Sequence, residues 1–217
     1  MFKYVIMGIQ GCGKGTQAKL LAKDFNLVHI SVGDIFRWHI QSHTKLAARI
    51  GRATAAGELV SDDIVEEIVR GRLDQHDWNY GFILDGFPRN RRQAEFFLES
   101  YDIDSVIQID VADQVVMDRV MNRRLCTKCG LDYNLIFHRP ANPSICDVCG
   151  GALSTRADDN RDAVQARLHD YHTKTKPILE LFSRKELIVS VDGAQPADEV
   201  QMELREKLGL ERGVLAH

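Results

Sequence analysis

The sequence lacks any apolar run long enough to cross a membrane. Its N-terminal apolar stretch, residues 2–7, is too short and wrongly flanked for a secretory signal peptide. We therefore expect the protein to stay in the cytoplasm, without a membrane partner.

A surplus of positive charge is also lacking. The chain has 28 Lys and Arg against 31 Asp and Glu, which gives a formal net charge of −3. This balance argues against broad affinity for nucleic acid, although local arginine clusters can still bind small anions. Repeats and low-complexity tracts are absent from the 217 residues, and 44% hydrophobic with 27% charged residues is ordinary for one elaborated globular domain.

Cysteine is scarce outside one segment. Four of the five cysteines form two C-x2-C pairs: Cys126, Cys129, Cys146 and Cys149. This spacing predicts a structural zinc site with four thiolate ligands, which leaves no open coordination position for chemistry. Gly130 and the Gly150–Gly151 pair follow the two cysteine pairs, where a tight turn favours a residue that tolerates positive φ. Disulfides and free thiols are the alternatives, and both fit a reducing compartment and this spacing less well.

A glycine-rich run, GIQGCGKGT at residues 8–16, lies between an apolar strand pattern and an amphipathic helical pattern. In that context it predicts a phosphate-binding loop, because glycines let backbone N–H groups surround a polyphosphate and Lys14 reaches the outer phosphates. Gly15 stands where most such loops carry the magnesium-binding Ser or Thr, and the hydroxyl follows at Thr16. We therefore expect a nucleoside triphosphate as ligand, with a plain flexible turn as the alternative.

Strand and helix patterns alternate along the chain. Apolar runs bounded by turn residues predict five strands, at 3–7, 28–30, 82–84, 105–109 and 187–191. Helical patterns lie at 17–25, 62–73 behind the expected cap Ser61, 93–101, 114–125, 163–182 and 197–208. Such alternation predicts an α/β fold with a five-stranded parallel sheet flanked by helices.

Two segments do not fit the alternation. Residues 31–60 are helical in pattern without a strand, and residues 122–159 contain the paired cysteines. We name them the helical segment and the cysteine segment. We expect both to be insertions at the carboxyl edge of the sheet, where open parallel sheets bind ligands, so that both could close over a nucleotide.

Charged side chains occupy selected positions near these segments. The strand in FILDGFPR (82–89) ends at Asp85, whose carboxylate would lie beside the phosphate loop and could hold hydrated magnesium. The candidate phosphate-binding arginines are Arg37, Arg89, Arg119, Arg123, Arg124, Arg156 and Arg167. Taken singly, each is as well explained as a solvated surface residue.

Together these motifs resemble those of the adenylate kinases. GIQGCGKGTQA, SVGDIFR, GELVSDDIV, LDGFPRNRRQAE, DRVMNRR, the cysteine segment and TRADDN occur in the family's order and cover nearly the whole chain. The resemblance is to the long-lid, zinc-containing bacterial type. It implies a P-loop core (1–30, 61–121 and 160–217), a nucleoside-monophosphate-binding insertion (31–60) and a zinc-binding lid (122–159).

The resemblance also implies the reaction, in which a monomer transfers the terminal phosphoryl group of ATP to AMP, with Mg²⁺, and gives two ADP. It assigns to ATP residues Gly11, Cys12, Gly13, Lys14, Gly15, Thr16, Arg119, Arg123, Asp132, Tyr133 and Gln195. It assigns to AMP residues Val32, Arg37, Glu58, Leu59, Val60, Gly86, Phe87, Pro88, Arg89, Gln93, Arg156 and Arg167. The implied catalytic set is Lys14, Arg37, Arg89, Arg123, Arg156, Arg167 and Asp85, because phosphoryl transfer depends mainly on positioning and charge neutralisation.

The acceptor remains open to an alternative. Val32 stands where adenylate kinases usually carry threonine, and pyrimidine-monophosphate kinases often have a small apolar residue there. A broader kinase that also accepts CMP and UMP is therefore a rival. The amide of Gln93 can offer one donor and one acceptor to an adenine edge, which favours AMP.

A second rival is a nucleotide-switched module whose zinc ribbon grips nucleic acid. The acidic balance and the lack of a guanine-reading N-K-x-D segment disfavour it. Asp158 and Asp159 have two compatible interpretations, as caps of the following helix and as partners of arginines in the cysteine segment.

Overall fold

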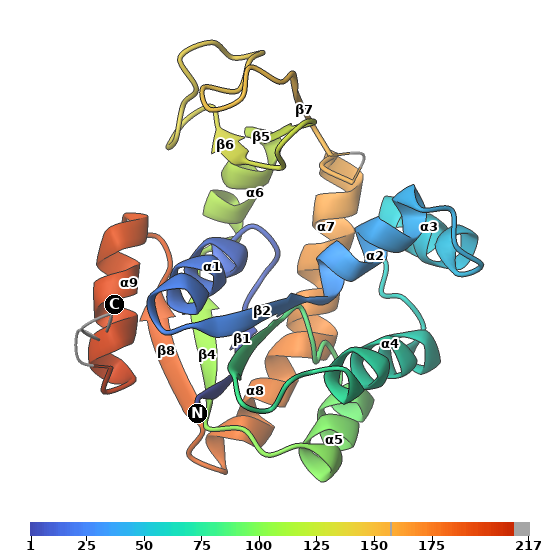
Figure 1. Ribbon diagram of the computed structural model, residues 1–217, viewed down its shortest axis with the longest axis vertical. Coiled ribbons are helices and arrows are strands. Elements are labelled where there is room, and N and C mark those ends of the chain that lie inside the picture. Colours follow the sequence, from blue (N-terminus) through green and yellow to red (C-terminus); the bar gives the residue numbers. More distant parts are fainter. Residues whose placement is uncertain (157, 211–217) are drawn as a thin grey trace.

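A computed structural model describes residues 1–156 and 158–210 of the protein. A five-stranded sheet in the order β2-β3-β1-β4-β8 forms its centre (Figure 1). The strands are β1 (Lys3–Met7), β2 (Leu27–Ser31), β3 (Gly81–Asp85), β4 (Ser105–Asp110) and β8 (Ile188–Asp192). All neighbouring pairs are parallel, which confirms the predicted fold class and each predicted strand.

Helices cover both faces of the sheet. They are α1 (Lys14–Asp24), α4 (Asp62–Asp74), α5 (Arg91–Ser100), α6 (Asp113–Met121), α7 (Arg161–Asp170), α8 (Lys176–Ser183) and α9 (Ala197–Lys207). Successive strand residues point to opposite faces, so Tyr4 and Ile6 pack in the cluster beneath α1 and α9. Val5 and Met7 pack in the other cluster, beneath α4, α5 and α8. Burial on both faces explains why the strands are continuously apolar in sequence.

None of the helices in the described part of the chain combines the length and the apolar character that a membrane crossing needs.

The prediction of a helix over residues 114–125 is wrong at its C-terminal end. Helix α6 ends at Met121, and β5 (Arg123–Cys126) follows. This strand pairs antiparallel with β6 (Asp132–Asn134) on one side and β7 (Leu153–Ser154) on the other. The pairing partners lie up to about thirty residues away, so the long-range contacts override the local helical pattern.

Of the predicted helix caps, Ser61 is confirmed in position, whereas the capping interpretation of Asp158 and Asp159 is wrong. Ser61 occupies the N-cap position of α4, but its side chain makes no capping hydrogen bond. Asn160, rather than Asp158 or Asp159, caps α7, and its side chain accepts a hydrogen bond from the Ala163 N–H at 2.9 Å. The two aspartates form ion pairs with arginines instead, as their other interpretation predicted.

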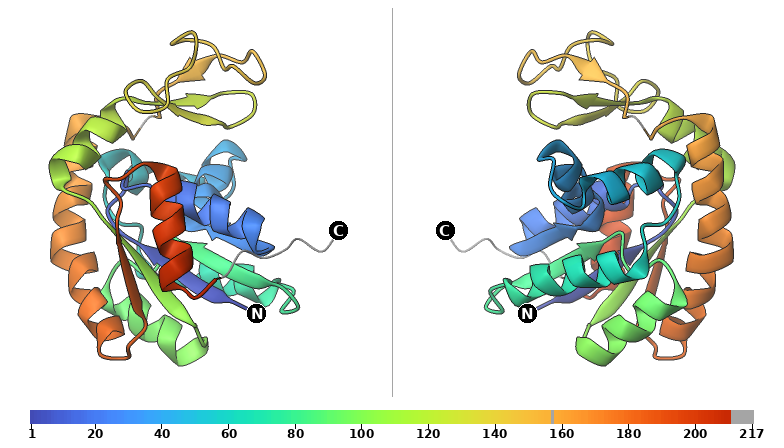
Figure 2. Two further views of the ribbon diagram at one scale, coloured as in Figure 1. Left: turned by 90° about the vertical axis from the view of Figure 1, so that its left-hand side faces the viewer. Right: turned by 90° about the vertical axis from the view of Figure 1, so that its right-hand side faces the viewer.

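The helical segment and the cysteine segment lie beyond the carboxyl ends of the strands. The helical segment contains α2 (Val32–Gln41) and α3 (Ala47–Ala56), and the cysteine segment contains β5, β6 and β7. Figure 2 shows the cysteine segment arching over the carboxyl edge of the sheet, with α7 and α8 running down one side of the molecule. Both segments thus border the space above the phosphate loop.

The helix predicted over residues 163–182 contains an irregular turn. Between α7 and α8, residues Tyr171–Thr175 form a π-helical turn, η1, in which the Lys176 N–H donates to the Tyr171 carbonyl. Pro177 follows within the first turn of α8. A proline ring clashes with the carbonyl four residues before it, and the wider π turn relieves that clash.

Candidate active site

A cleft of about 900 Å³ opens at the carboxyl edge of the sheet. Its walls come from the loops after β1, β2, β3 and β8, from the helical segment and from the cysteine segment. Every residue predicted for the donor, the acceptor or catalysis lines this cleft, whereas the four paired cysteines lie outside it. The structure therefore brings residues from the whole length of the chain to one place.

The loop after β1 has the shape of a phosphate cradle. The Lys14 ammonium donates to the carbonyls of Gly8 and Ile9, both at 2.7 Å, and so lies within the loop. Gly8 and Gly11 have φ of 146° and 98°. A Cβ at Gly11 would lie 2.5 Å from a methyl of Val120, and one at Gly8 would lie 2.5 Å from a backbone carbonyl. Only glycine fits these two positions, so the backbone can close around an anion at the N-terminus of α1.

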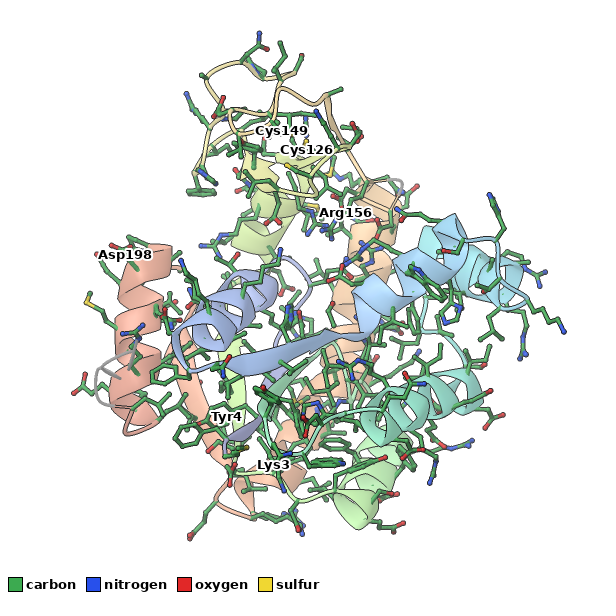
Figure 3. The ribbon with its side chains drawn as sticks, viewed as in Figure 1. Lys3, Tyr4, Cys126, Cys149, Arg156 and Asp198 are labelled. Atoms are coloured by element: carbon green, nitrogen blue, oxygen red, sulfur yellow. The ribbon has the colours of Figure 1, made fainter. Side chains whose placement is uncertain are left out.

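Four cations in the cleft have no carboxylate within 4.0 Å among the residues that the structure describes: Lys14, Arg89, Arg119 and Arg156. Arg156 lies between the cysteine segment and the core (Figure 3), and its buried Nε has no hydrogen-bond partner in that part of the chain. Burial and the charges of Arg123 and Arg37 lower the pKa of Arg156 to about 10. Burial likewise lowers the pKa of Arg89. Uncompensated buried cations of this kind fit an anionic ligand.

Three other arginines are held by aspartates. Both carboxylate oxygens of Asp159 accept from Arg123, with the Nε contact at 2.8 Å, and the Asp159 side chain is 1% exposed. Arg167 pairs with Asp158 and also donates to its carbonyl at 2.8 Å. Arg37 pairs with Asp34 on α2. A guanidinium has five N–H donors, so each arginine is oriented while donors remain for a ligand.

Arg119 joins three parts of the cleft. From α6 its Nη1 donates to the carbonyl of Cys12 at 3.2 Å and to that of Gly193 at 2.7 Å. Its guanidinium lies 5.5 Å from the ring centroid of Phe137 in the cysteine segment. Cys12 itself is 1% exposed, and burial raises the pKa of its thiol, so it packs as a small core residue.

The predicted acceptor side is only partly free to bind a base. The Gln93 amide oxygen accepts from the Arg89 N–H at 2.8 Å, and its nitrogen donates to Asp62 at 2.7 Å. One N–H and one lone pair of that amide remain. Val32 lines the cleft and is 2% exposed, and its side chain offers methyl groups but no hydrogen-bonding atom.

His29 is a cleft residue that the sequence patterns did not reveal. Its Nε2 lies 3.3 Å from an Asp85 carboxylate oxygen, with both side chains largely buried. A histidine inside an otherwise apolar strand is the signal that could have found it. The pairing of β2 with β3 brings His29 and Asp85 together, and the sequence patterns did not predict that pairing.

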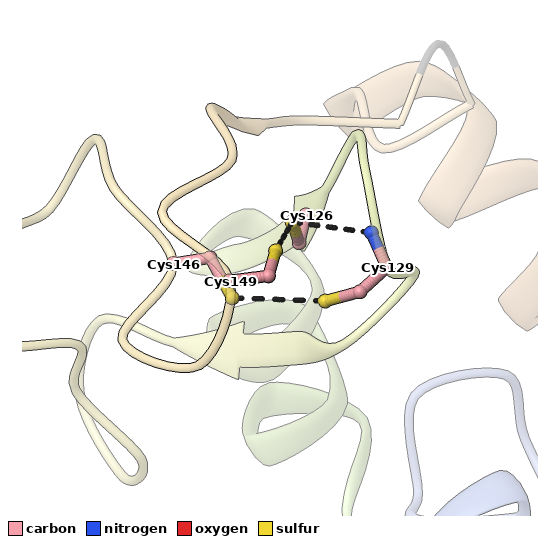
Figure 4. Close-up of side chains that lie close together, drawn as sticks. All are labelled: Cys126, Cys129, Cys146 and Cys149. Atoms are coloured by element: carbon pink, nitrogen blue, oxygen red, sulfur yellow. Dashed lines mark hydrogen bonds between the residues drawn. The ribbon is translucent and has the colours of Figure 1, made fainter.

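The four paired cysteines form one cluster (Figure 4). Their Sγ atoms all lie within 4.8 Å of one another, with Cys126 and Cys149 at 3.4 Å and Cys129 and Cys146 at 3.7 Å. A tetrahedral site with Zn–S bonds of about 2.3 Å has S···S edges of about 3.8 Å. The donor set therefore fits a thiophilic metal ion.

Equivalent turns shape the two halves of this cluster. The Gly130 N–H donates to the Cys126 carbonyl at 3.0 Å, and the Gly150 N–H donates to the Cys146 carbonyl at 2.9 Å. Their φ values of 74° and 67° confirm the predicted need for glycine.

Tyr133, predicted to contact ATP, lies in the wall between this cluster and the cleft. Its hydroxyl is 3.5 Å from Cys146 Sγ and accepts from the Asp147 N–H at 3.0 Å. The hydrogen bond from Tyr133 lowers the pKa of the Cys146 thiol to about 6. The Tyr133 hydroxyl therefore lies against the cysteine cluster, and the residue also lines the cleft.

Comparison with known proteins agrees with this geometry. The model of a family described as adenylate kinase matches residues 6–187. A protein of Caldicellulosiruptor saccharolyticus named adenylate kinase is 39% identical over 214 residues, which cover 96% of this chain and all of the relative. Adenylate kinases of Bacillus licheniformis and Bacillus subtilis are each 41% identical over 210 residues, covering 94% of this chain and 97% of theirs.

Proposed function

Because this chain belongs to the adenylate kinase family, a family of phosphotransferases, we propose that its cleft transfers the terminal phosphoryl group of ATP to AMP through the residues described above. The glycine loop and Arg119 bind the donor, and the surface formed by the helical segment and the loop after β3 binds the acceptor. Two ADP molecules leave after each turnover.

One observation carries the assignment of residues: four cations without carboxylate partners in the described chain converge on a single cleft beside a phosphate-binding loop. Two nucleotides whose phosphates meet end to end would supply the negative charge that balances these four cations. A surface that bound only a base or a sugar would not require buried guanidinium groups with lowered pKa values.

The chemistry follows from the charge distribution. Transfer of a phosphoryl group requires in-line positioning and neutralisation of charge on the moving oxygens, and no protein nucleophile. Lys14 and Arg156 supply charge without a competing carboxylate, while Arg123 and Arg167 are held in place by aspartates before a ligand binds. Closure of the cysteine segment over the cleft would exclude water and thereby favour transfer over hydrolysis.

Two metal ions complete the proposal. The Asp85 carboxylate, at the end of β3 and beside Gly15, would hold hydrated Mg²⁺, which supplies charge neutralisation to the bound phosphates. The four cysteine thiolates would hold Zn²⁺ in a closed structural site. We extend the proposal to the division into a core (1–30, 61–121 and 160–217), a monophosphate-binding insertion (31–60) and a lid (122–159), and to a monomer acting in the cytoplasm.

The direct test is formation of ADP from ATP, AMP and Mg²⁺ by the purified protein. Replacing Arg156 by alanine should lower kcat/KM by roughly a thousandfold, because one charge-stabilising arginine can raise the rate of phosphoryl transfer by about that factor. Arg161→Ala is the matched control, since Arg161 is an exposed arginine at the start of α7. Equal activities of the two variants would contradict the assigned site.

The second candidate function is a kinase that accepts CMP and UMP as well as AMP. It is favoured by the apolar side chain of Val32 and by the amide of Gln93, which already bonds to Arg89 and Asp62. Comparing AMP, CMP and UMP at saturating ATP distinguishes the two. We expect AMP to be preferred and Val32→Thr to sharpen that preference, because a hydroxyl can discriminate between base edges. Comparable kcat/KM for all three acceptors would establish the broader kinase.

A further inference from the structure

Two threonines in the helical stretch from α7 to α8 use their hydroxyls differently. The exposed Thr173 donates to the carbonyl of His169, four residues earlier in its own helix, at 2.7 Å. Thr175 is 8% exposed and donates to the carbonyl of Arg89, 86 positions away, at 2.7 Å. The first bond is the ordinary local one for a helical threonine. The second joins this helix to the loop after β3, which lines the cleft.

The π turn explains why Thr175 is free to make that contact. Within η1 the Tyr171 carbonyl, which lies four residues before Thr175, accepts from the Lys176 N–H. In this wider turn the Thr175 hydroxyl donates across the interface to the loop after β3, and not to the carbonyl four residues earlier. Pro177, just beyond the turn, supplies the steric reason for the widened geometry.

Arg89 is thereby fixed at three atoms. Its N–H donates to the amide oxygen of Gln93 at 2.8 Å, its Nε donates to the Gly86 carbonyl at 2.9 Å, and its own carbonyl accepts from Thr175 at 2.7 Å. Its two terminal nitrogens make no hydrogen bond to the protein within the described ranges. The backbone and the Nε of Arg89 are held in place, while the terminal nitrogens of this cleft-lining residue remain available to a ligand.

We propose that Thr175 is a positioning residue for phosphate recognition on the acceptor side, acting through Arg89. The hydroxyl of Thr175 holds the Arg89 carbonyl and so fixes where the guanidinium meets the phosphate of the nucleoside monophosphate. This inference rests on the proposed function, because that function makes Arg89 an acceptor contact. In enzymes that act by positioning, a misplacement of about 1 Å can lower the rate by about a hundredfold.

The first experiment compares Thr175→Val, which removes the hydroxyl but keeps the shape, with Thr175→Ser, which restores it. Thr173→Val is the matched control on the same helix. We expect Thr175→Val to raise the KM for AMP roughly tenfold and leave the KM for ATP within about twofold, with Thr175→Ser close to wild type. Equal changes in both KM values, or no recovery with serine, would overturn the inference.

A double-mutant cycle with Arg89→Ala separates positioning from a general structural effect. AMP binding is measured by calorimetry, and thermal midpoints verify that each variant is folded. If Thr175 acts through Arg89, Thr175→Val should weaken AMP binding in the wild-type background and have no further effect in the Arg89→Ala background. Additive losses would refute this. A wild-type protein that forms no ADP would refute the proposed function itself, whereas an active wild type with an unaltered Thr175→Val would refute only the role of Thr175.

Discussion

The sheet core and the cysteine segment are ordered by different interactions. Around the sheet, two clusters of side chains that are each at most 8% exposed fill the space between strands and helices. In the cysteine segment the buried cluster consists of Cys126, Tyr133 and Cys146, while Phe137 and Val148 are 63% and 74% exposed. A segment with so little apolar burial requires another source of stability, and the four-thiol cluster is placed to supply it.

The comparison also separates stability from chemistry. The core carries the phosphate loop directly after β1, but the charged groups that line the cleft lie outside the apolar clusters. In the core, we therefore expect that one substitution can abolish activity without loss of stability, and that another can lower stability without acting on the catalytic groups. The cysteine segment forms one wall of the cleft, and we propose that its metal-bound cluster maintains its fold, so activity and stability should be lost together there.

The largest effect should come from Lys14→Ala. Loss of the ammonium should lower kcat/KM by roughly a thousandfold or more, because it removes charge stabilisation at the transferred group. The thermal midpoint should move by no more than about 3 °C, since Lys14 is half-buried, lies outside the apolar clusters and bonds chiefly to the carbonyls of Gly8 and Ile9. Lys23→Ala, an exposed lysine on the same helix, is the control. Retained activity in the Lys14 variant would contradict the assignment.

The second effect concerns the cysteine segment. Cys146→Ser should release the metal, because the four ligands act as one site. The folded form of the cysteine segment should then be less stable by several kcal/mol. We expect rapid proteolytic cleavage within that segment, reduced phosphotransfer and an intact core by circular dichroism. Metal content by elemental analysis is the decisive measurement, with Cys12→Ala as the control for the fifth cysteine. Full metal content in the Cys146 variant would show that the cluster is not the metal site.

The third effect contrasts two phenylalanines. Phe97, on α5, is 0% exposed and packs against Phe87, so Phe97→Ala should cost about 3–5 kcal/mol in unfolding free energy. Phe137→Ala in the cysteine segment should change that free energy by about 0.5 kcal/mol or less. Urea denaturation measures both. Similar losses at the two positions would mean that the cysteine segment has an apolar core after all.

The smallest effect is a pH dependence at the junction of the two regions. Burial is the largest single influence on Asp158 and opposes its ionisation, but the charge of Arg167, hydrogen bonds to the carboxylate and the charge of Arg123 together outweigh it and lower the pKa of the carboxyl. A carboxyl with a lowered folded-state pKa stabilises the protein above its ordinary pKa of about 3.9. That contribution disappears as the pH falls through the folded-state value. Asp158→Asn should therefore flatten the acid side of the stability curve, measured by urea unfolding between pH 6 and 3, with Asp102→Asn as the exposed control.

Local signals were enough to predict the strands, the phosphate loop and the cysteine turns. Buried parallel strands are continuous apolar runs, and glycines at positive φ mark the turns, so short stretches of sequence contain the information. They were not enough at residues 123–126, where a helical pattern became β5 through pairing with distant strands. Nor did they reveal the π turn at Tyr171–Thr175, because a proline such as Pro177 in a helical pattern indicates an interruption without specifying its form.

The sequence by itself determined the chemistry available to this protein: one lysine in a glycine loop, a set of arginines and four thiols in two pairs. Only the tertiary structure decided which of these charges are neutralised. Arg123 and Arg167 find aspartates, while Arg89 and Arg156 remain without carboxylate partners in the described chain. The reason is physical, because a charge depends on everything within a few ångströms of it, and those neighbours come from positions far apart in the chain.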